Sequence, residues 1–119
     1  MWIGWLELDV LLGDVHSLKE KRGIVRPLIA ALWKGFPIAV AEVADQDLHR
    51  RARIGATAVS GDAAHLAAVL DDVERFVAER PEVQLLSARR GLASSDDDRL
   101  PPGMPERPPT LHRGWDPSC

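Results

Sequence analysis

The sequence predicts an α+β fold in which two helices cover one face of a four-stranded antiparallel sheet. Four segments have the apolar character or two-residue alternation of β-strands, and two longer segments repeat apolar residues at helical spacing. Their order along the chain is β-α-β-β-α-β, and right-handed crossovers place both helices on the same face. This arrangement is the ferredoxin-like split β-α-β sandwich, with strands in the spatial order 4-1-3-2.

The first predicted strand runs from Trp2 to Leu12 and alternates for much of its length. One of its faces is wholly apolar, whereas the other is mixed and carries Glu7 and Asp9. This pattern is typical of a strand in an antiparallel sheet that is covered on one side.

The segment His16–Arg22, with the sequence HSLKEKR, begins the first helix. Ser17 and Glu20 have the spacing of a capping box, in which each side chain accepts a hydrogen bond from the backbone N–H of the other residue. Pro27 is expected to kink the helix, and Gly35 is expected to cap its C-terminus. Its apolar stripe consists of Leu18, Val25, Leu28, Ile29 and Leu32.

The second and third strands form a predicted hairpin. Phe36–Val43 reads as the second strand, in which Pro37 favours a position at the sheet edge. The third strand spans Arg51–Ser60 and lies beside the first strand in the expected order. On the open face of the sheet we therefore expect cross-strand ion pairs among Glu7, Asp9, Arg51 and Arg53.

The second helix begins after Asp62, which can cap it, and ends before Pro81. The segment Val83–Arg89 is the fourth strand. The chain beyond it is rich in proline and has no apolar periodicity, which favours disorder. The sequence thus predicts a ferredoxin-like domain over residues 1–90 and a Pro-rich disordered C-terminal tail over residues 91–119.

Composition restricts the class of protein. The formal net charge is -3 over 119 residues, so nucleic-acid binding would depend on a local patch rather than on the overall field. The single cysteine, Cys119, excludes an internal disulfide and fits a reducing compartment. The N-terminal segment has the features of neither a signal peptide nor a membrane span. We expect a cytoplasmic protein that does not engage a membrane.

Three segments of the chain resemble a known family. HSLKEKR, the pattern AEV-x-DQDL over residues 41–48, and the end of the third predicted strand are similar to the YlxP-like family, a bacterial domain of unknown function. The resemblance covers roughly residues 1–90 and implies the ferredoxin-like fold. It implies no established activity. Members are often encoded beside translation and ribosome-maturation factors, so the resemblance implies a role near the ribosome.

The strongest candidate site is the basic flank of the first helix, with Trp33 at its far end. Cations in the first turns are locally unfavourable, because a helix N-terminus already carries partial positive charge. An anionic partner would explain them, and so would a solvated basic face. RNA phosphates would lie along the flank while a base stacks on the indole. The predicted RNA- or phosphate-binding residues are Lys19, Lys21, Arg22, Arg26 and Trp33.

Metal and catalytic chemistry have less support in the sequence. Glu42, Asp45, Asp47 and His49 surround the predicted hairpin turn, but their spacing matches no metal-binding motif, and acidic residues also stabilise turns. The histidines have no nucleophile at a recognisable spacing. We expect no cofactor, no metal and no enzymatic activity.

Two functions remain open at this point. The first is a non-enzymatic accessory protein that associates with the ribosome or RNA through the basic flank. The alternative is a self-associating or small-ligand-sensing ferredoxin-like module, in which a homodimer forms through the open sheet face at Ile3, Trp5 and Val59. An RNA-recognition motif is not indicated, because the third strand offers no aromatic side chain for stacking.

Overall fold

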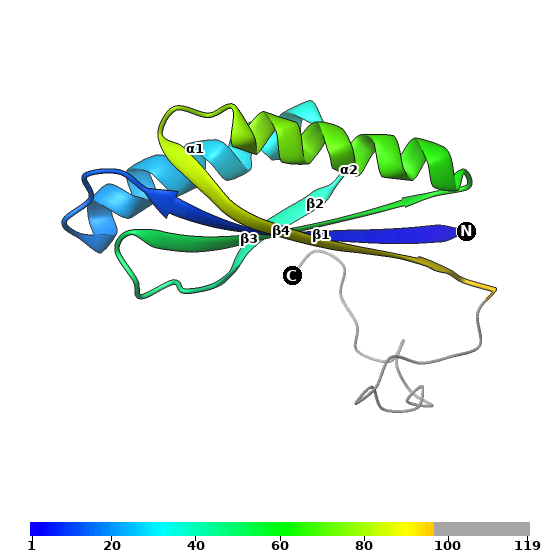
Figure 1. Ribbon diagram of the computed structural model, residues 1–119, viewed down its shortest axis with the longest axis horizontal. Helices are drawn as coiled ribbons and strands as arrows, with labels where there is room; N and C mark the ends of the chain where they lie inside the picture. Colours follow the sequence, from blue (N-terminus) through cyan, green and yellow to red (C-terminus); the bar gives the residue numbers. More distant parts are fainter. Residues whose placement is uncertain (97–119) are drawn as a thin grey trace, which may run out of the picture.

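Six elements follow one another in the predicted order in a computed structural model, which describes residues 1–96. Both helices lie on one face of the sheet, and the other face is open (Figure 1). The predicted disorder of the tail concerns mainly residues that lie outside this range. The elements are β1 (Trp2–Leu12), α1 (Leu18–Gly35), β2 (Ala39–Ala44), β3 (Arg51–Ser60), α2 (Ala63–Ala78) and β4 (Val83–Ser94).

The sheet has the strand order β2-β3-β1-β4, and all neighbouring strands are antiparallel. Read from the other edge, this is the predicted order 4-1-3-2, so the predicted fold class is confirmed. β1 is central and pairs with β3 on one side and β4 on the other. β2 is an edge strand, as predicted, although Pro37, on which that prediction rested, lies before its first residue.

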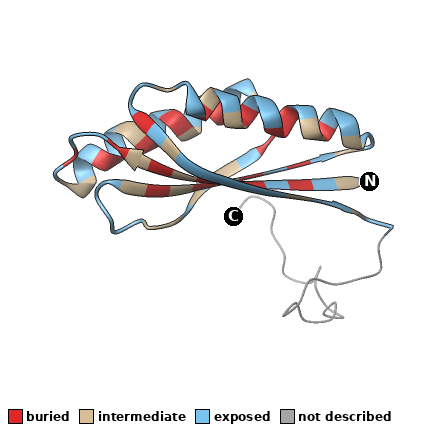
Figure 2. Ribbon diagram, in the orientation of Figure 1, coloured by how far each residue is buried: buried red, intermediate tan, exposed pale blue. Residues whose placement is uncertain are grey.

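The covered face of the sheet supplies the core. Leu6, Leu8 and Val10 of β1 are each at most 1% exposed, while the residues between them point to the open face. Figure 2 shows that the buried positions of both helices face the sheet. The helices contribute Val25, Leu28 and Leu32 from α1 and Leu66, Val69, Leu70, Val73 and Val77 from α2.

The N-terminus of α1 is capped nearly as predicted. The Ser17 hydroxyl accepts a hydrogen bond from the backbone N–H of Glu20 at 3.1 Å. The Glu20 carboxylate reaches one residue further back than expected, because it accepts from the N–H of His16 at 3.0 Å rather than from that of Ser17. Ser17 thus satisfies a backbone donor of the first helical turn, and Glu20 fixes the residue just before the cap.

The C-terminal end of α1 differs from the prediction. The helix continues across the exposed Pro27 and ends at Gly35, and Phe36 rather than Gly35 is the cap residue. The Phe36 N–H donates to the carbonyl of Leu32 at 3.2 Å. The following residues form a short connection, so β2 begins at Ala39 instead of the predicted Phe36.

β4 is longer than predicted, ending at Ser94 instead of Arg89. Its last residues pair with β1 as far as Trp2, and the N–H of Ser95 donates to the carbonyl of Met1 at 2.8 Å. This end of an edge strand is largely exposed on both faces, so it carries no alternation of apolar residues. The ordered sheet therefore extends past the boundary that composition placed at residue 90.

Ser17→Ala is expected to lower the free energy of unfolding by about 1 kcal/mol, because the N–H of Glu20 loses its acceptor. Urea denaturation followed by circular dichroism measures this change. Ser87→Ala, on the exposed side of β4, is the matched control and should be neutral. Equal midpoints for the two variants would contradict a stabilising cap at Ser17.

The end of β4 can be tested by comparing a chain that stops at Asp96 with one that stops at Gly91. The shorter chain loses the last three residue pairs with β1. If those pairs contribute about 1 kcal/mol, its melting temperature should be lower by about 4–8 °C. Identical thermal melts would mean that residues 92–94 do not stabilise the sheet.

Candidate nucleic-acid interface

Lys21 is the only charged residue among residues 1–96 that is buried, with an exposed fraction of 2%. Its Nζ donates to the backbone carbonyls of Asp45 at 2.6 Å and Leu48 at 2.7 Å. The Glu42 carboxylate lies 2.9 Å from the same nitrogen. The three donors of the ammonium thus have three acceptors, so Lys21 does not belong to the exposed flank in which the sequence placed it.

These contacts join the first helix to the β2–β3 turn. Asp45 has a left-handed backbone conformation, with φ of 62°, and its carbonyl also accepts from the N–H of Leu48 at 3.1 Å. Lys21 therefore contacts both the carboxylate of Glu42, near the end of β2, and the carbonyls of the turn. Within residues 1–96 the structure brings together no group of three His, Cys, Asp or Glu side chains that could hold a metal.

A signal for the burial of Lys21 was present in the sequence. Lys21 lies four residues before Val25, seven before Leu28 and eleven before Leu32, which is the spacing of the buried stripe of α1. A lysine on that stripe must either extend its ammonium to solvent or find acceptors inside. The acceptors come from a turn more than twenty residues away, which helical periodicity alone does not reveal.

The other predicted residues of the flank lie together on the exposed side of α1. Lys19, Arg22 and Arg26 are exposed, and Trp33 is 62% exposed. Spacings of three, four and seven residues place all four on one face of the helix. Over residues 1–96, none of the three cations forms an ion pair with an acid. We call these three residues the basic row.

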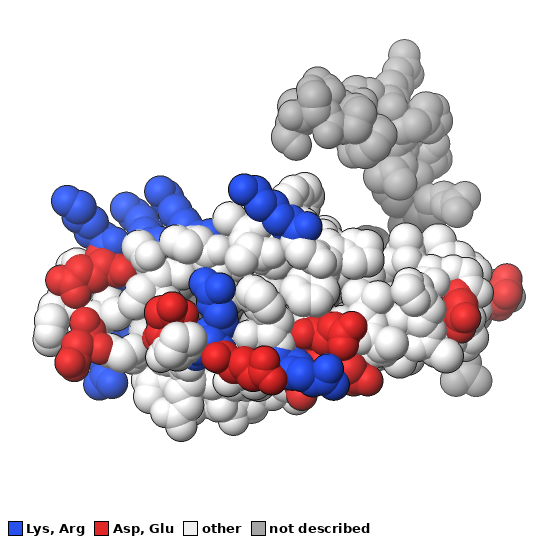
Figure 3. Space-filling model, turned by 90° about the horizontal axis from the view of Figure 1, so that it is seen from above, with Lys and Arg blue, Asp and Glu red and all other residues white. Residues whose placement is uncertain are grey.

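Figure 3 shows Lys and Arg side chains gathered along one edge of the helical side of the molecule. A groove of about 350 Å³ runs beneath this edge, between α1 and β2. Arg22 and Arg26 line it together with Glu42 and Gln46. Because Lys21 already balances the charge of Glu42, the two guanidinium groups leave the groove positively charged.

The open face of the sheet carries the predicted ion pairs. Arg51 pairs with Asp9, and Arg53 lies 3.5 Å from Glu7. Arg89 also pairs with Glu7 at 2.9 Å, a contact that the sequence prediction missed. The hydrogen bond and the negative charge of Asp9 raise the pKa of Arg51, so this guanidinium stays charged. These cations are already matched by acids, unlike those of the basic row.

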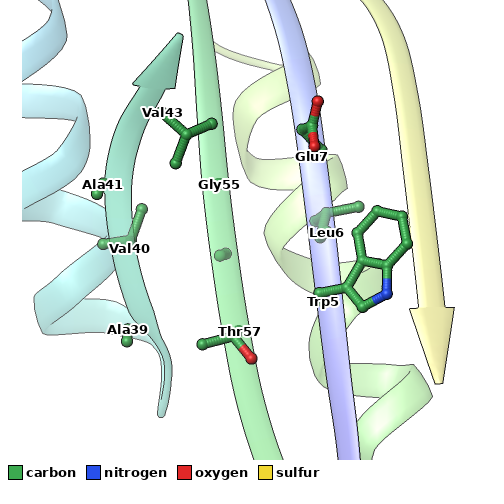
Figure 4. Close-up of a pocket in the computed structure, with 10 residues that line it drawn as sticks. Trp5, Leu6, Glu7, Ala39, Val40, Ala41, Val43, Gly55 and Thr57 are labelled. Atoms are coloured by element: carbon green, nitrogen blue, oxygen red, sulfur yellow. The ribbon is translucent and has the colours of Figure 1, made fainter. Parts of the chain in front are cut away.

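The other half of the open face is apolar and holds a hollow of about 500 Å³ (Figure 4). Trp5 leans over Gly91 of β4, and a Cβ at that position would overlap the indole. Val43 lies over Gly55 of β3 in the same way, since a Cβ there would come within 2.7 Å of its methyl group. Glycine at both positions allows the larger side chains to lie flat on the sheet. Ile3 and Val59 are cross-strand neighbours on this face.

Comparison with known proteins identifies the family. Residues 3–90 match the family described as a protein of unknown function, DUF503. The chain belongs to this family. It is also 29% identical over 82 residues to the uncharacterized protein YlxP of Bacillus subtilis (strain 168), across 69% of this chain and 89% of that protein. The resemblance to the YlxP-like family is thereby confirmed.

In this DUF503 protein, the segments that carry the family resemblance meet at Lys21. HSLKEKR contains Lys21 itself, and AEV-x-DQDL contains Glu42, Asp45 and Leu48, whose oxygen atoms surround the ammonium. This part of the sequence signature therefore has a structural explanation. No helix within residues 1–96 is long and apolar enough to cross a membrane.

Lys21→Met is expected to lower the free energy of unfolding by about 3 kcal/mol. The variant removes the partner of a mostly buried carboxylate and of two turn carbonyls, while keeping the apolar part of the side chain. Urea denaturation measures the loss. Lys19→Met, two residues away on the exposed side, should change stability by less than about 0.5 kcal/mol. Equal effects of the two variants would contradict the assigned role of Lys21.

Proposed function

We propose that this DUF503 protein is a non-enzymatic accessory factor that associates with the ribosome, or with RNA, through the basic row of α1. The observation that carries the proposal is that Lys19, Arg22 and Arg26 lie exposed on one helix face without an acidic partner within residues 1–96. Such a row is suited to a chain of phosphates, which arginine and lysine bind through charge-assisted hydrogen bonds.

The distribution of charge over the helical layer supports this choice of surface. α2 and its cap residue Glu79 expose acids, including Asp71 and Asp72, whereas the outer side of α1 exposes cations. A polyanion would be repelled by the first surface and attracted by the second. The overall charge of -3 adds no general attraction, so binding would be confined to the basic row.

RNA is favoured over other polyanions by the setting of the YlxP-like family near translation and ribosome-maturation genes. That genomic setting is an association, and the physical support for the proposal comes from the three cations of the basic row. Nothing in the proposal requires catalysis. Glu42 and the turn carbonyls beside the row are occupied by Lys21.

A second candidate function is self-association through the apolar half of the open face. The hollow there and the exposed Trp5, Ile3 and Val59 favour it. The face is small, however, because strands of 11, 6, 10 and 12 residues span roughly 600 Å². A stable interface usually buries about 800 Å² on each partner. Half of the face is also occupied by ion pairs, so we rank this function second.

Replacing Lys19, Arg22 and Arg26 together with Gln is expected to weaken binding to ribosomal subunits and to RNA. Three lost phosphate contacts should lower the slope of log affinity against log salt concentration by about two units. Sucrose-gradient co-sedimentation and fluorescence anisotropy over a salt series measure this loss. Thermal stability should change little, because exposed cations near a helix N-terminus contribute almost nothing.

A charge-matched control removes three cations from other surfaces, namely Arg53, Arg75 and Arg89, each replaced with Gln. Their ion pairs are exposed and contribute little to stability. This variant has the same net charge as the basic-row variant but keeps the proposed site. Equal loss of binding in the two variants would mean that net charge, and not the basic row, determines binding. Unchanged binding in the basic-row variant would refute the proposed site.

A further inference from the structure

We propose that the RNA bound by the basic row is single-stranded, and that one of its unpaired bases enters an apolar hollow beside Trp33. This inference rests on the proposed function and specifies the form of its partner. The hollow lies where the end of α1 meets the edge of the sheet and measures about 680 Å³. It is lined mainly by Trp33, Phe36, Pro37 and Ile38, with Val59 from β3.

The wall of the hollow opposite Trp33 is held in place by the fold. Phe36 packs edge-on against Phe76 of α2, with ring centroids 5.6 Å apart, and Arg80 lies over the Phe76 ring at 5.3 Å. The backbone N–H of Phe36 donates to the carbonyl of Leu32, and Pro37 has a fixed φ and restricts the backbone of Phe36 before it. An incoming flat group would therefore find a preformed site, which lowers the cost of ordering on binding.

The position of Trp33 connects the hollow to the basic row. Trp33 follows Arg26 by seven residues, which is about two helical turns or 10 Å along the same face. A strand whose phosphates contact Arg22 and Arg26 would continue past the indole. From Lys19 to Trp33 the face is about 21 Å long, which a stacked strand would cover with about six nucleotides.

Charge distinguishes an RNA base from an apolar peptide as the occupant. Arg22 and Arg26 stand two to three turns before the hollow, and Lys34 is exposed beside Trp33. An apolar segment of a protein would fill the hollow but would leave these cations without a counterpart. A nucleotide provides both an anionic backbone and a flat aromatic face that stacks on tryptophan.

A duplex would not place a base in this hollow, because its bases are paired and stacked on one another. Single strands, loops and ends expose base faces that aromatic side chains can reach. The hollow also offers little hydrogen bonding for reading a base. Among the lining residues that the structure describes, Thr57 carries the only hydroxyl, and that hydroxyl donates to the carbonyl of Gly4 at 2.7 Å. We therefore expect stacking without strong sequence preference.

The test compares a mixed-sequence RNA strand of about sixteen nucleotides, rich in G and C and unable to pair with itself, with the duplex that it forms with its complement, using the full chain and fluorescence anisotropy. The parent protein should bind the single strand at least about tenfold more tightly than the duplex. Trp33→Ala should weaken single-strand binding about tenfold and leave the salt slope unchanged, since the phosphate contacts remain. Trp33→Phe should retain most of the affinity, because a stacking ring is kept.

Trp5→Ala is the matched control, since Trp5 is an exposed tryptophan on the open sheet face, away from the basic row. It should bind the single strand as the parent does. Equal binding by the parent and Trp33→Ala, or equal affinity of the parent for strand and duplex, would overturn this inference while the proposed function stands. If the parent binds neither RNA at low salt, the proposed function itself fails, and this inference fails with it.

Discussion

The buried ammonium of Lys21 is the interaction on which the arrangement of this protein depends. A charged group can leave water only when its hydrogen-bonding capacity is fully used, and here two carbonyls and a carboxylate meet that requirement. The contact fixes α1 against the β2–β3 turn. It also fixes the rotation of the helix about its own axis. With Lys21 directed inward, Lys19, Arg22 and Arg26 are directed outward.

The same contact shows where sequence reasoning succeeds and where it fails. Alternation in β1 and helical spacing in α2 depend on burial against the sheet, so they predict the elements and, through their order, the topology. The start of β2 and the end of β4 differ from the prediction, because neither a short connection nor an exposed strand end has a periodicity that marks it. The role of Lys21 depends on acceptors that are distant in the sequence. Its charge predicts an exposed position, whereas its place on the apolar stripe indicates a buried one.

The cations on the open sheet face form ion pairs, whereas those of the basic row form none within residues 1–96. This difference identifies the candidate interface. On the open sheet face, Arg51 pairs with Asp9, and Arg53 and Arg89 share Glu7, so each arginine there has an acidic partner on β1. Isolated exposed ion pairs contribute little to stability, and unpaired cations at a helix start contribute less. The three cations of the basic row therefore contribute little to folding, and the proposed contact with a phosphate backbone would account for their position.

The family signature combines structural and candidate functional residues in one short segment. HSLKEKR holds Lys21, which fixes the helix, together with Lys19 and Arg22, which that fixed helix presents to solvent. Arg26 and Trp33 lie beyond the signature and extend the same face toward the hollow at the sheet edge. The phosphate contacts that we propose for Lys19 and Arg22 would thus follow from the helix orientation that Lys21 fixes. The proposed base stacking depends instead on the indole of Trp33, two helical turns after Arg26. The two contributions can be separated experimentally, because phosphate binding is strongly sensitive to salt and stacking is not.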